Sequence, residues 1–316
     1  MDCLGSNPRG HTKIRVEVEI VTELTKTKAL KDFLNNIGST VFLLNTICVG
    51  LDRVKKEKIT KYDKSLRINW SSEDPVNDSQ RARIYANKAT LAFTVDTLDQ
   101  YLRSLVAKDN PRVFLDSQLI DDLRESSIRE RIDILMTKAQ PNEEYWAPFV
   151  QLLICWRNRM IHSHAANTLN RRDINILTKN KEVIQKNHSG IDIAVTLDRY
   201  LKGQGPSLKD ISTMVAILIK SIRLVDSKII QNFIGKEYIL DAVANQVKFN
   251  GKDSITEIKM IWNLTRQRKQ QKIYNLLSHY GVLSGDRNEI IPIPLIEEVI
   301  DLELTEVLKI INRTGN

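Results

Sequence analysis

Three long segments with apolar residues at helical spacing dominate this chain and restrict it to helical architectures. Residues 79–107 and 207–233 contain neither glycine nor proline, and residues 28–58 contain no proline. In each segment apolar positions recur every three or four residues, which marks one face of an α-helix. Several helices of this length pack as an antiparallel bundle. The sequence therefore predicts an all-α fold.

The apolar positions of these segments define the expected core. Residues 28–58 place inward Leu30, Phe33, Leu34, Ile37, Val41, Leu44, Ile47, Leu51 and Val54. The segment that starts at Asp78 or Ser79 places inward Ile84, Leu91, Val95, Leu98, Leu102 and Leu105. The third, capped by Ser207 and Asp210, places inward Ile211, Met214, Val215, Leu218, Ile222 and Val225. Residues 60–78 are expected to form a polar loop that contains Pro75.

Shorter helices are expected between the long ones. Residues 117–138 form one broken helix or two short ones, because Ser127 and Glu130 have the spacing of a capping box. Another helix is expected from Ala147 or Pro148 to His164, with the proline tolerated in its first turn.

The chain divides into three regions by composition. Residues 1–27 form an arm whose segment 14–20, IRVEVEI, alternates like a strand, and a second copy of the chain could pair with it. Residues 28–235 form the helical bundle, and residues 166–206 are expected to be a long basic loop inserted in it. Residues 236–316 predict a smaller, mostly helical region with short helices, a hairpin around Gly285 and Asp286, and a final helix over 295–312.

The sequence gives no sign of export or of a membrane anchor. We find no apolar run long enough to span a bilayer, and the first residues lack the pattern of a signal peptide. The three cysteines, Cys3, Cys48 and Cys155, are widely spaced and form no CxxC pair. We therefore expect a cytoplasmic protein with no membrane partner.

The positive charge of the chain is concentrated in one part of it. The formal net charge is +8, and residues 151–250 hold 15 basic against 8 acidic residues, an excess of 7. A local basic excess favours a polyanionic partner such as nucleic acid, although a solvated basic surface explains it equally well.

This basic region begins at the stretch CWRNRMIHSHA, residues 155–165. At about 100° per residue, Arg157 lies at the centre of an apolar stripe. The stripe consists of Trp146, Phe149, Val150, Leu153, Ile154, Met160 and Ile161. A guanidinium keeps its charge, so Arg157 must be paired or reach water. Either Arg157 bridges to a carboxylate on another helix, or it serves a functional site.

Two polar residues lie beside Arg157 on the same helix. Asn158 and His162 fall at about 100° and 140° from Arg157, next to each other because they are four residues apart, while Arg159 points the opposite way. His162 alone is more typical of a half-buried structural histidine. The combination of arginine, amide and histidine beside a basic segment is what favours a functional site.

The stretch RNRMIH, residues 157–162, resembles the Arg-x4–6-His signature of the HEPN superfamily, with Asn158 as the polar residue that commonly follows the arginine. The helical bundle context over about residues 28–235 fits the same resemblance. It implies a metal-independent endoribonuclease that forms a homodimer with a composite active site, in a toxin–antitoxin, abortive-infection or other antiviral role. Partners would be RNA and an antitoxin or sensor protein.

The resemblance implies that Arg157, Asn158 and His162 are the catalytic residues. We expect further RNA contacts from basic residues nearby, namely Arg159, His164, Arg171, Arg172, Lys179 and Lys181. One departure concerns the branch regulated by adenylylation of a tyrosine two residues after the histidine. This chain has His164 there, so such regulation is not expected.

The residue types suit RNA cleavage without a metal or cofactor. A histidine can take the proton from a 2′-OH that attacks the adjacent phosphate, or protonate the leaving oxygen. An arginine can stabilise the charge that gathers on that phosphate. His162 and His164 could be metal ligands, but no supporting cluster accompanies them.

No nucleotide-binding, zinc-protease or serine-hydrolase motif occurs in the sequence. The segment RQRKQQK, residues 266–272, reads as a solvated helix face, with RNA or partner contact as the alternative. Two other functions stay open. One is a non-catalytic helical protein that binds nucleic acid or a nucleotide through the same basic groove. The other is an interaction scaffold in which Arg157 is a structural bridge.

Overall fold

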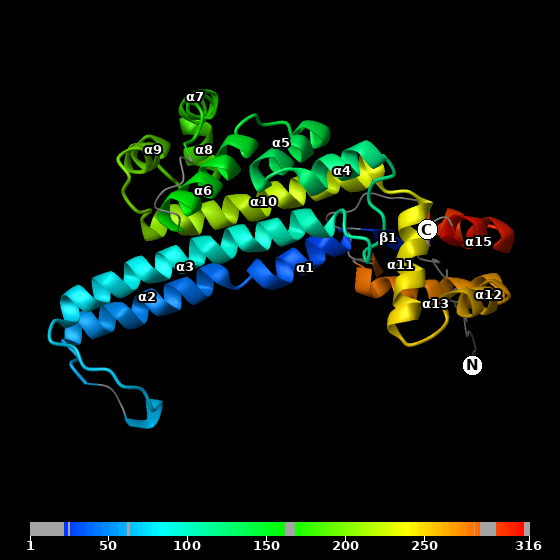
Figure 1. Cartoon of the computed structure of the whole chain (residues 1–316), viewed down its shortest axis with the longest axis horizontal. Coiled ribbons are helices and arrows are strands. Elements are labelled where there is room, and N and C mark those ends of the chain that lie inside the picture. The colour runs from blue at the N-terminus through cyan, green and yellow to red at the C-terminus, as the bar shows by residue number, and fades with distance from the viewer. Residues whose placement is uncertain are drawn as a thin grey trace, which may run out of the picture.

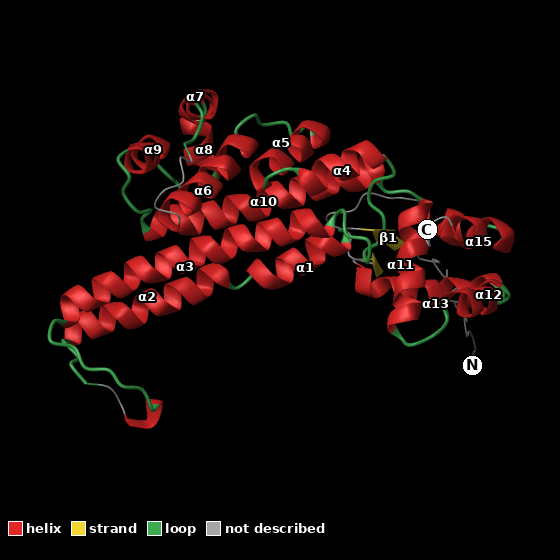
Figure 2. Cartoon of the chain, in the orientation of Figure 1, coloured by secondary structure: helices red, strands yellow, loops and turns green. Residues whose placement is uncertain are grey.

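The computed structural model describes residues 22–24, 26–61, 64–161, 168–280, 282–284 and 295–312. It confirms the all-α prediction, because helices form nearly all of the regular structure (Figures 1 and 2). A two-stranded antiparallel ribbon pairs β1 (Thr22–Leu24) with β2 (Val282–Ser284), with Thr22 opposite Ser284. The predicted strand over residues 14–20 lies outside the described residues.

The first long segment is two helices where one was predicted. α1 (Lys28–Ile37) and α2 (Thr40–Glu57) meet at Gly38 and Ser39. A side chain at position 38 would bring its Cβ within 2.9 Å of the Leu34 carbonyl oxygen, so this close approach requires glycine. Thr27 caps α1 by accepting a hydrogen bond from the Leu30 amide at 3.1 Å.

The second long helix, α3 (Pro75–Ser104), begins earlier than predicted. Pro75 occupies its first turn, where the missing amide hydrogen has no helical partner to lose, and is therefore not part of the loop. Asp74 caps the helix by accepting from the Asn77 amide at 3.1 Å. A 3-10 turn, η1 (Lys64–Leu66), lies in the loop between α2 and α3.

The shorter helices and the third long helix agree with their capping signals. α4 (Ser117–Glu125) and α5 (Ile128–Ala139) are separate helices, and Ser127 and Glu130 form the predicted capping box. α6 (Trp146–Ile161) carries the arginine motif. α10 (Leu208–Phe233) starts at a second capping box, between Ser207 and Asp210.

The prediction that residues 166–206 form a loop was wrong. Three short helices occupy most of that segment: α7 (Arg171–Lys179), α8 (Lys181–Asn187) and α9 (Ile193–Leu201). Asn170 caps α7 and Asp192 caps α9, and each side-chain oxygen accepts a hydrogen bond from the backbone amide three residues later. Each helix buries one or a few apolar side chains, among them Leu177, Ile184 and Leu197. The single buried apolar residues of α7 and α8 show no periodicity in the sequence, whereas the buried Ile193, Leu197 and Tyr200 of α9 do have helical spacing.

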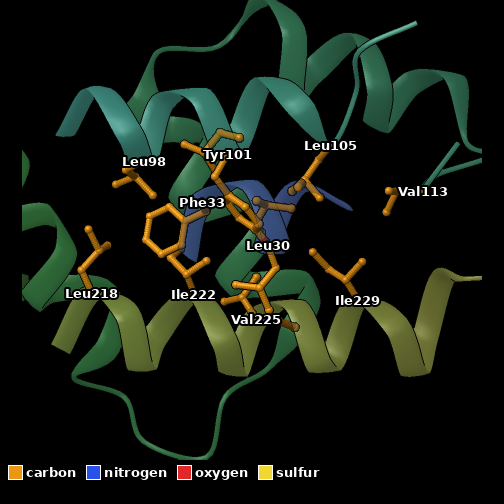
Figure 3. Close-up of a cluster of buried hydrophobic side chains, with 14 of the residues drawn as sticks. Leu30, Phe33, Leu98, Tyr101, Leu105, Val113, Leu218, Ile222, Val225 and Ile229 are labelled. Carbon is orange, nitrogen blue, oxygen red and sulfur yellow. The ribbon is translucent and has the colours of Figure 1, made fainter. Parts of the chain in front are cut away.

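The centre of the bundle lies between α1, α3 and α10 (Figure 3). Phe33 meets Tyr101 edge-on at 5.8 Å between ring centroids, and Ile222 and Val225 approach from α10. Buried Asp226 accepts hydrogen bonds from the amide and hydroxyl of Thr27 at 2.9 and 2.5 Å, which fixes the start of α1 against α10.

Two residues predicted to face inward do not. Ile47 on α2 is 50% exposed, and Ile84 on α3 is 55% exposed. Both lie on the hairpin formed by α2 and α3, in which α2 makes its main contacts with α3. Helical spacing predicted the buried positions of α10 correctly, but among the described elements α2 has α3 as its main neighbour, so part of its apolar surface stays exposed.

The C-terminal region packs around α11 (Lys236–Phe249). Its neighbours are α12 (Ser254–Trp262), α13 (Arg266–Leu277), α14 (Leu295–Ile300) and α15 (Leu304–Asn312). The final helix predicted over 295–312 is therefore two helices, and the predicted hairpin around Gly285 lies outside the described residues. A 3-10 turn, η2 (Ser278–Tyr280), precedes β2. Arg112 connects this region to the bundle through a 2.6 Å ion pair with Asp241.

Candidate functional site

Helix α6 is a core helix over most of its length. Ten of its residues are buried: Trp146, Pro148, Phe149, Val150, Gln151, Leu152, Leu153, Ile154, Cys155 and Trp156. It packs against α3, α5, α7 and α10, so neighbours cover all its sides. The single apolar stripe expected from the sequence was too narrow a description, because Leu152, Cys155 and Trp156 are buried as well.

Arg157 is the first residue of α6 to leave the core. Its side chain is 20% exposed, and its Nη2 lies 2.8 Å from Oδ1 of Asp96 on α3. Its Nη1 donates to the Asn158 side-chain oxygen at 3.0 Å. Its Nε is buried and has no hydrogen-bond partner among the described residues. The arginine is thus a bridge between two helices, and its buried Nε–H is left without a partner among the described residues.

Asp96 makes this bridge accessible from solvent, because its side chain is 67% exposed. An ion pair with an exposed carboxylate is weak, since water and salt screen it. A phosphate can therefore compete with Asp96 for the guanidinium, because both anions accept two parallel hydrogen bonds from its planar fork. The sequence did not identify Asp96, although it left open that Arg157 bridges to some carboxylate.

Arg159, two residues later, is held by α9 instead. It donates a hydrogen bond to the Tyr200 carbonyl oxygen, and its guanidinium lies over the Tyr200 ring at 4.2 Å from the centroid. The Tyr200 hydroxyl oxygen in turn accepts a hydrogen bond from the Leu169 amide at 3.0 Å. This arrangement fixes α9 against the end of α6. The stacking partner of Arg159 had no signal in the sequence.

The remaining candidates lie on either side of a gap in the described residues. α6 ends at Ile161, and His162 and His164 lie outside the described residues. Arg171 and Arg172 open α7 and are exposed. Lys179, in the last turn of α7, forms a 3.1 Å ion pair with Glu144, and Lys181 is exposed at the start of α8.

The structure therefore brings Arg157 and Asn158 together and turns Arg159 to another neighbour. The basic residues of α7 and α8 lie on surface helices. Of these two helices, α7 packs directly against α6. Among the described residues, no group of three or more His, Cys, Asp or Glu side chains is placed to hold a metal ion.

Cys155 precedes the motif and is buried next to Tyr200. Burial raises the pKa of its thiol, which keeps the sulfur protonated and unreactive. Cys48 is also buried and free. Both residues act as small apolar side chains in the packing.

Comparisons with protein-family models, with curated proteins and with solved structures find no match to this chain.

Proposed function

We propose that the chain is a metal-independent endoribonuclease of the HEPN type, acting as a homodimer. The observation that carries this proposal is the position of Arg157. It emerges from the core at the end of α6, keeps an unpartnered Nε among the described residues, and pairs with an exposed carboxylate. His162, the candidate acid or base, follows this helix by one residue in the sequence.

The proposed reaction uses the ribose 2′-OH as the nucleophile. His162 removes its proton or protonates the leaving oxygen, and the 2′-oxygen forms a bond to the adjacent phosphorus as the 5′-oxygen leaves. Arg157 donates to the phosphate oxygens while negative charge gathers on them. Asn158, which already accepts a hydrogen bond from Arg157, holds the guanidinium in the orientation that the phosphate needs.

Growth arrest or antiviral defence is the proposed role, because an enzyme that cuts cellular RNA needs a trigger or an inhibitor. An antitoxin or sensor protein is therefore part of the proposal. The exposed basic residues Arg171, Arg172 and Lys181 are the proposed RNA contacts next to the site, and their contribution should weaken as salt rises.

The ion pair between Arg157 and Asp96 also favours a second function. In that alternative Arg157 only ties α6 to α3, and the chain is a non-catalytic helical protein that binds nucleic acid, a nucleotide or a protein partner. The two functions differ in what Asp96 does. If Arg157 is catalytic, a phosphate of the substrate replaces Asp96 as its partner, so the reaction does not depend on Asp96. If Arg157 is structural, the fold depends on Asp96, which is the one carboxylate paired with Arg157 in the described structure.

The experiment that separates them compares Arg157→Ala with Asp96→Asn in an RNA cleavage assay, with folding followed by circular dichroism. For a nuclease, Arg157→Ala should lower the cleavage rate by about 10²- to 10³-fold while Asp96→Asn keeps it. For a non-catalytic chain in which Arg157 is a structural bridge, both variants lose similar stability and the wild type itself does not cleave RNA. Cleavage by folded Arg157→Ala at the wild-type rate overturns the proposal.

A further inference from the structure

Helix α2 is apolar but poorly covered. Residues 40–51 contain no charged side chain. Of its 18 residues only Thr40, Leu44 and Cys48 are buried. Its main contact is α3, with which it forms the hairpin that extends beyond the bundle (Figure 1). A helix that is apolar on several sides is normally buried on several sides, so this hairpin lacks part of its expected cover.

A groove runs between the two helices of the hairpin. It has a volume of about 480 Å³, and α2 contributes Leu43, Ile47 and Leu51 to it, while α3 contributes Tyr85, Ala89 and Phe93. Leu43 is 54%, Tyr85 75% and Phe93 47% exposed. A contiguous exposed apolar surface of this kind marks an interaction site more often than an ordinary protein surface.

The charge pattern favours a second copy of this chain as the occupant. Within residues 84–95 of α3 the one charged side chain is Lys88, so the centre of the hairpin offers almost nothing for an acidic or basic partner to match. An apolar surface complements itself across a two-fold axis. Two such hairpins face to face complete a four-helix bundle, in which each helix gains the neighbours that α2 lacks.

The size of the face can be compared with that of a standard dimer interface. With its 18 residues at about 1.5 Å each, α2 is roughly 27 Å long, and two packed helices are roughly 20 Å wide. The projected face is therefore on the order of 500 Å², and the accessible area of its side chains exceeds this projection. This projected area is smaller than the area of about 800 Å² that each partner of a standard interface buries, and the protruding side chains reduce the difference.

A lipid bilayer is the competing occupant. The helical segment Lys28–Glu57 is long and apolar enough to cross a membrane by length and composition, and 22% of its most apolar 18-residue stretch is buried. However, this segment is interrupted at Gly38 and Ser39, and it contains the side-chain amides of Asn35, Asn36 and Asn45. Each such group is costly in hydrocarbon, whereas a protein interface leaves its rim wet.

We propose that the groove between α2 and α3 is the homodimer interface of this protein. The proposal locates the dimer contact of the proposed nuclease. The interface itself does not depend on the nuclease activity, and only its effect on RNA cleavage rests on the proposed function. Asp96 lies three residues after Phe93 and eleven after Tyr85, so helical spacing puts all three on one face of α3. Dimerisation through the groove therefore sets the Arg157–Asp96 pair of each copy beside the interface.

Sedimentation velocity of the full chain between about 1 and 100 μM tests the interface. The wild type should sediment as a dimer. Leu43→Glu and Tyr85→Glu each place a charge in the apolar contact, which should raise the dissociation constant by at least about 100-fold. Phe249→Glu is the matched control, because Phe249 is an exposed aromatic residue on α11, away from the hairpin. It should leave the dimer intact.

The interface proposal is overturned by a wild type that is monomeric at 100 μM, or by a dimer that both groove variants leave unchanged while they remain folded. It is also overturned if the monomer floats with phosphatidylcholine–phosphatidylglycerol vesicles and the groove variants abolish flotation. A groove-dependent dimer that does not cleave RNA supports the interface and counts against the proposed nuclease, so the two proposals fail separately.

Discussion

Arg157 on α6 and Asp96 on α3 form a 2.8 Å ion pair in which the arginine is mostly buried and the aspartate mostly exposed. This asymmetry limits what the pair contributes to folding. Exposure of Asp96 lets water and salt screen the attraction, while burial of Arg157 still costs desolvation. The pair therefore orients the guanidinium more than it stabilises the fold.

A double-mutant cycle should show this small contribution. We expect a coupling free energy of about 0.2–1 kcal/mol between Arg157→Ala and Asp96→Ala in urea unfolding, and less in high salt. The cycle Arg112→Ala with Asp241→Ala serves as the comparison. Its pair is joined by two guanidinium hydrogen bonds and its aspartate is nearly buried, so its coupling should be larger. A coupling above about 2 kcal/mol for Arg157 and Asp96 contradicts this expectation and supports the structural bridge.

Cleavage should proceed without divalent metal and leave a 2′,3′-cyclic phosphate. Both results follow from attack by the 2′-OH of the substrate itself, so DNA and RNA with 2′-deoxy at the cut site should resist. Mass spectrometry of the product ends identifies the cyclic phosphate, and a reaction in EDTA measures the metal requirement. Activity that disappears in EDTA and returns with Mg²⁺, or equal cutting of DNA, would show that the chemistry is different.

Asp226 makes the stability of the bundle depend on pH. Burial raises the pKa of Asp226 to about 6, although hydrogen bonds from Thr27 and Tyr101 lower it in part. Because the folded state holds the proton more tightly than the unfolded chain, the stabilisation from protonated Asp226 is present below about pH 4 and is lost as the pH rises through 6.

The measurement is the free energy of unfolding of the wild type minus that of Asp226→Asn, taken between pH 4 and pH 7. This difference should fall on raising the pH, by an amount on the order of 3 kcal/mol. Asp121→Asn, on the exposed part of α4, is the control for the loss of one negative charge. A difference that is constant across this range would refute the raised pKa.

Much of the fold could be predicted because its signals are local. Ser127 with Glu130 and Ser207 with Asp210 marked the starts of α5 and α10, and the structure confirms both capping boxes. A cap is made between residues three apart, so the sequence contains the whole interaction. The buried face of α10 could also be predicted, because over 26 residues the helical spacing of apolar positions is clear even where single positions depart from it.

Other features depend on contacts that sequence spacing does not reveal. Helices α7 and α8 were missed because each buries a single apolar residue, Leu177 or Ile184. Helix α9 was missed although its buried Ile193, Leu197 and Tyr200 have helical spacing. Ile47 has the spacing of a core residue, but it is 50% exposed in the described part of the chain. At the candidate site, the sequence placed Arg157 and Asn158 side by side on α6. The partner Asp96, 61 positions away, required the tertiary structure.

Mixing two inactive variants tests whether the active site is shared between subunits. Arg157 has its exposed partner Asp96 on the face of α3 that also carries Phe93, so a dimer through the α2–α3 groove places the two arginines beside the contact. If each site combines Arg157 of one chain with His162 of the other, a mixed dimer of Arg157→Ala and His162→Ala chains retains one intact combination. Random reassociation of equal amounts makes half of the dimers mixed, so about a quarter of the wild-type rate should return.

The control for this experiment adds Tyr85→Glu to both chains. If dimerisation through the groove creates the site, the quadruple combination should stay inactive however the chains are mixed, because the mixed dimer no longer forms. Recovery that survives Tyr85→Glu would show a shared site built at another surface. No recovery from the simple mixture, with exchange of subunits verified by a mass tag on one chain, would mean that each subunit carries a complete site of its own.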